Sequence, residues 1–194
     1  MEMILASKNA HKAKEMQEIL GDGFTLVTQD EAGFGNIDVI EDGETFRENA
    51  IKKAKAIMNA SKKTAIADDS GLCVDALSGR PGVYTARFAG EGATDEENIK
   101  KLLSEMDGIE WEKRTAKFVC AIAVAALGED VKVYQGECEG YILEEKHGDN
   151  GFGYDPVFFV PEYKKSMAEL DGEIKNSISH RFNALNKMKI DLAK

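Results

Sequence analysis

The chain has 194 residues, of which 43% are hydrophobic and 31% charged, and its formal net charge is −10. This length fits one domain of ordinary size that can bury a core without disulfide staples. The negative charge argues against a nucleic-acid surface, because the chain has no broad basic field to release counterions. A phosphate pocket stays possible, since it needs only a few local cations and backbone N–H groups.

Cysteine usage and the start of the chain favour a cytoplasmic protein. Cys73, Cys120 and Cys138 lie far apart and have no CxxC spacing, which is typical of small core residues in a reducing compartment. Residues 1–6 lack the basic region and long apolar run of a signal peptide. No apolar stretch reaches the ~18 residues that a bilayer-spanning helix needs. We therefore expect neither a membrane nor a nucleic acid as a partner.

The first half of the chain predicts strands that alternate with helices. Residues 2–7 form a short apolar strand, and a helix follows the Ser-Lys-Asn that ends it. A capping box at Thr45–Glu48 opens a second helix, which runs to about residue 61. Residues 64–67 form a strand that enters a turn at Asp68-Asp69, because Asp before Ser-Gly is common turn chemistry.

The second half predicts a long hairpin and further helices. Residues 94–97 form another capping box, which opens a helix to about residue 106. Residues 115–127 are apolar on both alternation faces, which indicates a central strand covered on both sides, and residues 131–145 form its antiparallel neighbour. The remaining elements are a buried strand over 156–160, a brief helix from 166 and a last helix over 179–192. Together they predict an α/β fold around a mixed central sheet flanked by helices.

The first candidate site is Ser7-Lys-Asn-Ala-His-Lys12, between the first strand and the first helix. Ligands collect at such turns, where the helix N-terminus presents free N–H groups to an anion. Ser7 and Asn9 can hydrogen-bond phosphate oxygens, and Lys12 can add a charge. Alternatively, Ser7 or Asn9 only caps the helix and Lys12 lies in solvent. The segment lacks the glycines of a Walker loop.

The second candidate site is the acidic pair Asp68-Asp69. Adjacent carboxylates repel each other unless a cation or a solvent-filled cleft relieves them. Glu41 lies in a loop before the second helix and can converge on the same place. Carboxylate oxygens suit Mg²⁺, which keeps several waters and bridges substrate phosphates. The alternative is a solvated turn without a metal.

The third candidate site is the loop His147–Phe159, "HGDNGFGYDPVFF". Its glycines let the backbone approach a ligand closely, and its aromatic rings can stack on a base. Lys175, His180 and Arg181 bring cations near the start of the last helix, where they oppose the helix dipole unless an anion compensates. Alternatively, the segment is a tight loop with a core aromatic, and the cations mark a solvated helix start.

The motifs are more specific in combination than each is alone. In chain order they are S-x-N-x-x-K, T-F-x-E-N-A-x-x-K-A, A-x-A-D-D-S-G-L, P-G-V-Y-x-A-R, G-F-G-Y-D-P and K-x-S-I-S-H-R. This set resembles the inosine triphosphate pyrophosphatase family, house-cleaning nucleotidases, from residue 4 to about 184. The resemblance implies a single ITPase-like domain over 1–194, elongated and two-lobed with a cleft between the lobes, and a homodimer. It also implies Mg²⁺-dependent hydrolysis of ITP, dITP and XTP to the monophosphate and pyrophosphate.

The resemblance assigns roles to residues of this chain. Asp69 is then the catalytic proton acceptor and, with Glu41, a metal ligand. The implied substrate-binding residues are Ser7, Lys8, Asn9, Ala10, His11, Lys12, Lys53, Ser70, Phe152, Gly153, Tyr154, Asp155, Lys175, His180 and Arg181. Lys8 and His11 depart from the commonest family pattern, which has small residues there. The departures bear on loop shape and affinity rather than on the reaction class.

Two other functions stay open, together with the question of how the base is selected. One is a Maf-like pyrophosphatase for pyrimidine or modified nucleotides, and the other is a nucleotide-binding protein without turnover. Hypoxanthine and xanthine carry a 6-oxo acceptor where adenine carries an amino donor, so donors in the protein would discriminate between them. The candidate donors are Arg181, Lys175 and the backbone amides near Phe152.

Overall fold

The computed structural model describes residues 1–193, which form a mixed seven-stranded sheet in the order β2-β1-β3-β4-β5-β6-β7. The strands are β1 (Glu2–Leu5), β2 (Thr25–Thr28), β3 (Ala65–Val74), β4 (Thr115–Ala125), β5 (Lys132–Ile142), β6 (Phe158–Val160) and β7 (Lys165–Ser166). β1 pairs in parallel with β2 and β3, whereas β6 pairs antiparallel with β5 and β7. The predicted mixed α/β sheet is therefore confirmed.

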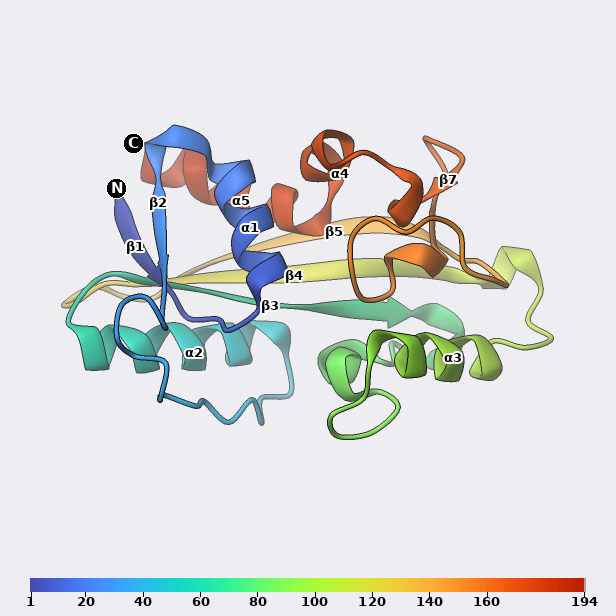
Figure 1. Cartoon of the computed structure of the whole chain (residues 1–194), viewed down its shortest axis with the longest axis horizontal. Helices are drawn as coiled ribbons and strands as arrows, with labels where there is room; N and C mark the ends of the chain where they lie inside the picture. Colours follow the sequence, from blue (N-terminus) through green and yellow to red (C-terminus); the bar gives the residue numbers. More distant parts are fainter. Residues whose placement is uncertain (194) are drawn as a thin grey trace. The chain divides into compact units, whose positions relative to one another are not determined.

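Five α-helices accompany the sheet within residues 1–193 (Figure 1). They are α1 (Ala10–Leu20), α2 (Phe46–Ser61), α3 (Asp95–Glu105), α4 (Gly172–Ile178) and α5 (His180–Leu192). Short 3₁₀ turns connect them, including Gly82–Arg87 and Asp155–Val157. The sequence predicted four of these helices but not α4, whose seven residues are too few for an apolar period to be recognised.

The contacts divide the chain into two units, and the boundary falls inside β3, β4 and β5. Unit 1 contains residues 1–69, 120–136 and the chain from 180 onward, and unit 2 contains residues 70–119 and 137–179. Each unit has its own apolar core. The cleft between two lobes and the single two-lobed domain over 1–194 stay predictions.

In unit 1, α1 and α5 cover one face of the sheet and α2 covers the other (Figure 1). Alternate residues of each strand serve the two faces, as the pleat requires. Ile66, Ile122 and Val124 pack with α1 and α5. Alanine makes up much of the α2 face: Ala65, Ala67, Ala121, Ala123 and Ala125 from the strands cluster with Ala50 and Ala54 of α2, together with Ile4 and Ile57.

Asp68 and Asp69 lie inside β3, so the prediction of a turn at this pair is wrong. The strand continues to Val74 and is buried at nearly every position. Leu72 and Val74 belong to the core of unit 2, and burial of these two residues overrides the local turn preference of Asp-Ser-Gly. Because successive side chains of a strand point to opposite faces, the two carboxylates separate.

The two predicted capping boxes differ. At α3, Thr94 accepts from the Glu97 N–H and Glu97 accepts from the Thr94 N–H, so the box is complete. At α2, Thr45 accepts from the Glu48 N–H, but the Glu48 carboxylate accepts from the Glu44 N–H instead. The helix begins where the sequence predicted, but only the Thr45 side-chain bond of the capping box is formed.

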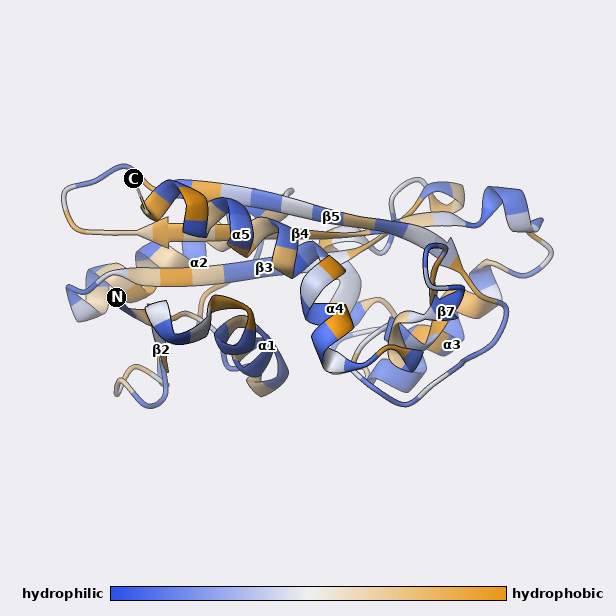
Figure 2. Cartoon of the chain, turned by 90° about the horizontal axis from the view of Figure 1, so that it is seen from above, coloured by the Kyte–Doolittle hydropathy of each residue, from blue (hydrophilic) through white to orange (hydrophobic). Residues whose placement is uncertain are grey.

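Helix α5 packs directly on the backbone of β5 at Gly136. In Figure 2 hydrophobic and hydrophilic positions both occur along α5, and Ala184, Leu185 and Met188 of this helix are buried. A Cβ at Gly136 would lie 2.2 Å from the His180 carbonyl oxygen and 2.4 Å from the Ala184 nitrogen. The missing side chain at Gly136 therefore fixes where α5 can sit.

Replacing Gly136 by alanine is expected to destabilise the protein by about 2 kcal/mol, because the added methyl overlaps backbone that cannot move aside. Gly23→Ala is the matched control, since no atom lies within 4 Å of a Cβ at that position. Urea unfolding measures both free energies. Equal stability of the two variants would show that α5 does not depend on the close approach at Gly136.

Candidate active site

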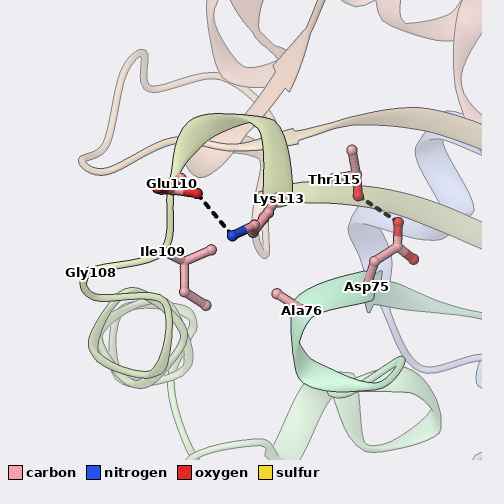
Figure 3. A pocket seen from close by; sticks show the side chains of 7 residues that line it. All are labelled: Asp75, Ala76, Gly108, Ile109, Glu110, Lys113 and Thr115. Atoms are coloured by element: carbon pink, nitrogen blue, oxygen red, sulfur yellow. Dashed lines mark hydrogen bonds and ion pairs between the residues drawn. The ribbon is translucent and has the colours of Figure 1, made fainter.

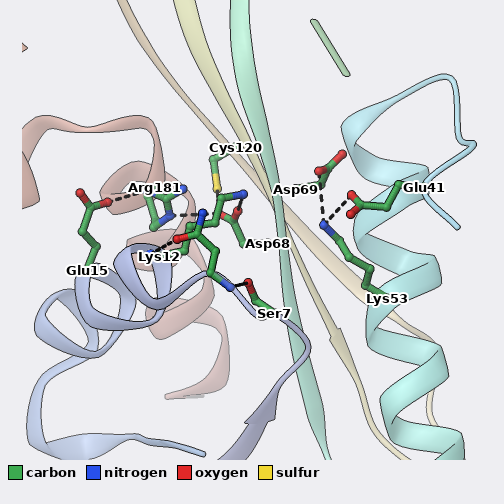
Figure 4. A network of polar contacts seen from close by, with 10 residues as sticks. Ser7, Lys12, Glu15, Glu41, Lys53, Asp68, Asp69, Cys120 and Arg181 are labelled. Carbon is green, nitrogen blue, oxygen red and sulfur yellow. Dashed lines mark hydrogen bonds and ion pairs between the residues drawn. The ribbon is translucent and has the colours of Figure 1, made fainter. Parts of the chain in front are cut away.

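The central feature of the site is that Asp68 and Asp69 serve opposite faces of β3 (Figure 4). Asp68 points toward α1 and α5, whereas Asp69 points toward α2. Each carboxylate meets a lysine from its own side, Lys12 on α1 and Lys53 on α2. The two carboxylates therefore belong to two charge clusters on opposite faces of the strand, although the Asp68 charge still contributes to the raised pKa of Asp69.

Asp68 is the centre of a buried network. Its Oδ1 accepts from Lys12 Nζ at 2.5 Å, and its Oδ2 accepts from Arg181 Nε at 3.0 Å and from Cys120 Sγ at 3.1 Å. Arg181 also donates to Glu15 at 2.6 Å. Burial alone would raise the pKa of Asp68, but the Arg181 and Lys12 charges outweigh it and hold this pKa well below its usual range. Asp68 is therefore a permanent anion that orients Lys12.

Cys120 behaves as a hydrogen-bond donor within this network. Burial, together with the Asp68 charge, raises the pKa of the Cys120 thiol well above its usual range. The thiol therefore stays protonated and donates a hydrogen bond to the Asp68 carboxylate. Cys73 and Cys138 are also free thiols, which agrees with the expected use of cysteine as a small, largely buried residue.

The segment before α1 caps the helix. Asn9 Oδ1 accepts from the Lys12 N–H at 3.1 Å, and Ser7 Oγ accepts from the Asn9 N–H at 3.1 Å. Asn9 thus caps α1, and its role in ligand binding stays a prediction. Lys12 pairs with Asp68 rather than lying in solvent. Lys8 forms an exposed ion pair with Asp38. Ala10 and His11 are exposed at the helix start.

On the other face of β3, Lys53 links the two predicted metal ligands. Its Nζ donates to Glu41 Oε2 at 2.8 Å and to Asp69 Oδ1 at 3.3 Å. The other oxygen of Asp69, Oδ2, is buried and has no hydrogen-bond partner. A buried carboxylate oxygen without a donor is costly, and it fits a site whose partner arrives with a ligand.

The three groups shift one another's pKa values in different directions. Burial raises the pKa of Asp69 to about 6, with Lys53 opposing the rise and Glu41 adding to it. Burial would also raise the pKa of Glu41, but the Lys53 charge and hydrogen bond lower it on balance. Lys53 loses solvation, yet the Asp69 and Glu41 charges raise its pKa. Asp69 is therefore the group of the three that can exchange a proton near neutral pH.

Asn49 positions Glu41, a role that the sequence analysis missed. Its side chain is buried on α2, and Oδ1 accepts from the Gly43 N–H at 2.8 Å. A Cβ at Gly43 would lie 2.6 Å from this oxygen, so the loop that carries Glu41 can close on α2 only with glycine there. The signal in the sequence is spacing, because Asn49, Lys53 and Ile57 recur every four residues on the apolar stripe of α2.

Glu41 and Asp69 fit a magnesium site with few protein ligands. No group of three or more His, Cys, Asp or Glu residues that could hold a metal occurs within residues 1–193. Mg²⁺ is commonly held by one or two carboxylates plus waters and substrate phosphates. Two carboxylates around a shared cation, one with an unsatisfied buried oxygen, provide that donor set.

The aromatic loop lies in unit 2, where Asp155 organises it. Asp155 Oδ2 accepts from Lys175 Nζ at 2.7 Å and from the Phe152 N–H at 3.1 Å. The Lys175 ammonium lies 4.9 Å from the centre of the Phe152 ring, in a cation–π contact. The Tyr154 hydroxyl donates to the Thr85 carbonyl at 2.7 Å. Asp155 thus holds the loop together instead of presenting an open carboxylate.

The predicted residues fall into two groups, one in each unit. Unit 1 contains Ser7, Lys8, Asn9, Ala10, His11, Lys12, Glu41, Lys53, Asp69, His180 and Arg181, and unit 2 contains Ser70, Phe152, Gly153, Tyr154, Asp155 and Lys175. His180 and Arg181 are buried at the start of α5. The sequence indicated Arg181 as a candidate hydrogen-bond donor to the purine base. In the structure its guanidinium donates to Asp68 and Glu15, so it holds Asp68 in place.

A separate hollow of about 710 Å³ opens in unit 2 (Figure 3). Its lining residues are Asp75, Ala76, Gly108, Ile109, Glu110, Lys113 and Thr115. Lys113 pairs with Glu110, and the Thr115 hydroxyl donates to Asp75. None of these residues belongs to the predicted site, and the polar side chains named here pair with each other.

Comparison with known proteins gives full-length matches. The Ham1 family model matches residues 3–190. The dITP/XTP pyrophosphatase of Bacillus subtilis (strain 168) is 53% identical over 188 residues, which cover 96% of this chain and 94% of that protein. The Staphylococcus aureus Ham1 protein structure has 44% identity and a TM-score of 0.90, with 100% of this chain and 98% of that chain covered. A HAM1 protein from Coxiella burnetii gives 42% identity, a TM-score of 0.90 and the same coverage.

The fold and the lysine–carboxylate clusters define an α/β protein with a charged site built on one central strand. The chain belongs to the Ham1 family, which agrees with the resemblance found in its motifs. Within residues 1–193, no helix combines the length and apolar character needed to cross a membrane.

The same substitution at the two neighbouring aspartates is expected to change stability in opposite directions. Because the folded-state pKa of Asp69 is raised from 3.8 to about 6, its ionisation destabilises the fold increasingly as pH rises from about 4 to 6. Asp69→Asn should therefore raise the unfolding free energy at pH 7.5 by about 2 kcal/mol without metal, and by almost nothing below pH 4.

Asp68→Asn should instead lower the unfolding free energy by about 3 kcal/mol, because Lys12 and Arg181 would keep buried charges without their anion. Urea titrations in chelator at pH 7.5 and pH 4 measure both variants. If Asp69→Asn were less stable than wild type at pH 7.5, the conclusion that the ionised Asp69 carboxylate destabilises the fold would be wrong.

Proposed function

We propose that this chain is a nucleoside triphosphate diphosphatase that hydrolyses non-standard purine nucleotides. ITP, dITP and XTP are the proposed substrates, and the monophosphate and pyrophosphate are the products. The names of relatives such as the Bacillus subtilis dITP/XTP pyrophosphatase support this reaction. The observation that carries it in this chain is the Glu41–Lys53–Asp69 cluster, with its buried, unsatisfied Asp69 oxygen.

The cationic groups of unit 1 are suited to a triphosphate. Lys12 and Lys53 lie on opposite faces of β3, yet the charges of both act on Asp69 and lower its pKa. The start of α1 lies beside Lys12, whose own backbone N–H is already capped by Asn9. Phosphoryl and nucleotidyl transfer depend mainly on positioning and on neutralising charge at the phosphate oxygens. We assign these roles to the two lysines, with Ser7 and Asn9 as further hydrogen-bonding groups.

Asp69 is the proposed proton acceptor for the attacking water. In the metal-free protein burial raises the pKa of Asp69 to about 6, so this carboxylate is more basic than an ordinary aspartate. Glu41 and Asp69 would hold Mg²⁺, which supplies positive charge to the triphosphate and to the departing pyrophosphate. Lys53 contacts both carboxylates and keeps their oxygens in one orientation.

The loop of unit 2 is the proposed base-recognition element. Phe152 offers a ring for stacking, and the Asp155–Lys175 ion pair fixes that ring. Each candidate donor for a 6-oxo group has an acceptor in this structure: Arg181 contacts Asp68, while Lys175 and the Phe152 N–H contact Asp155. A base oxygen would have to replace one of these acceptors.

The proposal includes a cytoplasmic homodimer that removes these nucleotides from the precursor pool, on the basis of the family resemblance. The alternatives are a Maf-like pyrophosphatase and a nucleotide-binding protein without turnover. The Asp69 carboxylate favours an enzyme over a binding protein, because a pure triphosphate binder gains nothing from a buried acid beside the phosphate. A substrate panel separates the two pyrophosphatase classes.

Pyrophosphate release over a nucleotide panel tests the reaction. We expect rapid release from ITP, dITP and XTP, slow release from pyrimidine triphosphates, and loss of activity when Mg²⁺ is chelated. Asp69→Asn should lower kcat by at least about a hundredfold although its stability rises. Wild-type activity in this variant would exclude the proton-acceptor role, and tight ITP binding without product would favour the non-enzymatic alternative.

Base selection is tested by comparing specificity constants. We expect kcat/KM for ITP to exceed that for ATP by about a hundredfold or more, because the adenine amino group would face donors instead of acceptors. Steady-state kinetics with ITP, ATP and GTP measure the ratios. Equal kcat/KM values for ITP and ATP would show that the protein does not recognise the 6-oxo group of the base.

A further inference from the structure

The backbone N–H groups of the base-recognition loop are held by two carboxylates. Asp155, inside the loop, accepts from the Phe152 N–H. The next residue, Gly153, donates its N–H to Asp95 Oδ2 at 2.8 Å. Asp95 is the first residue of α3, 58 positions earlier in the chain. The loop is therefore tied to a second element of unit 2 at the residue beside its stacking ring.

The loop needs such a tie because its backbone has unusual freedom. Gly151 and Gly153 both have positive φ, +77° and +61°, and glycine adopts such conformations as readily as others. Gly151 is confined, since a Cβ there would lie 2.1 Å from Asp155 Oδ2, but no atom lies within 4 Å of a Cβ at Gly153. Gly153 therefore has no side-chain packing of its own, and its N–H bond to Asp95 is the contact that ties this residue to α3.

The other polar residues of the first turn of α3 have different partners. Thr94 and Glu97 form the capping box. Glu96 pairs with Lys146, and both side chains of that ion pair are largely exposed, 67% and 44%, so the pair contributes little. Asp95 is the acid of this turn that contacts the Phe152–Asp155 backbone.

We propose that Asp95 is a positioning residue for base recognition: by accepting the Gly153 N–H it anchors the loop to α3 and so supports the Phe152 ring in the place where the Asp155–Lys175 pair holds it. This inference rests on the proposed function, in which that ring stacks on the purine. Asp95 touches neither the phosphate cluster nor the metal ligands. Its loss acts on the binding of the base and leaves the chemical step intact.

The test compares three variants. Asp95→Ala removes the acceptor, Asp95→Asn keeps an acceptor oxygen without the charge, and Glu96→Ala removes the same charge one residue along the same turn. For Asp95→Ala we expect KM for ITP to rise about tenfold while kcat changes less than twofold. Asp95→Asn should restore most of the wild-type KM, and Glu96→Ala should match wild type.

Amide hydrogen exchange provides a readout that does not need activity. Residues 151–155 should exchange faster in Asp95→Ala than in wild type, Asp95→Asn or Glu96→Ala, with equal melting temperatures indicating an intact fold. Unchanged exchange and unchanged KM in Asp95→Ala would overturn the inference, as would an equal rise of KM in Glu96→Ala. Absence of pyrophosphate release from every nucleotide in the wild type would instead refute the proposed function, and the exchange rates would still decide whether Asp95 restrains the loop.

Discussion

The alternation of side chains along β3 governs the chemistry of unit 1, because it sends two neighbouring carboxylates into different surroundings. Asp68 enters a cluster with Lys12 and Arg181 that balances its charge, and its pKa falls far below normal. Asp69 receives more burial than compensation, and its pKa rises to about 6. One strand thus supplies both a fixed anion that holds a lysine in place and a carboxylate that can accept a proton. Both depend on the extended backbone, since a turn at this pair would have put the two charges side by side.

The buried ion pairs around Asp68 are better understood as determinants of position than of stability. Moving a carboxylate, an ammonium and a guanidinium out of water costs several kcal/mol each, and their mutual attraction returns about as much. What the cluster provides is geometry: β3, α1 and α5 are brought to one point, and α5 reaches it because Gly136 of β5 has no side chain. Such a network tolerates few partial substitutions, since removal of one member leaves the others charged and buried.

Much of the fold could be predicted because local patterns and burial agree. The starts of α2 and α3 follow capping residues, and β4 follows an apolar run. Prediction failed at β3, where Asp-Ser-Gly favours a turn locally while Leu72 and Val74, in the core of unit 2, require a strand. The motifs indicated which residues gather in unit 1, but not their partners. Arg181 meets Asp68 across 113 positions and Glu15 across 166, and no periodicity within a segment encodes contacts at that separation.

The alanine-lined contact between α2 and the sheet has a consequence for how the site meets its ligand. A methyl side chain has no rotamers, so this interface has few alternative packings to exchange among. Lys53 lies on α2 between the buried Ala50, Ala54 and Ile57, so the packing of this helix against the sheet determines where its side chain begins. The Lys53 ammonium already contacts Glu41 and Asp69, so part of the side-chain entropy that a ligand would have to restrict is lost on folding.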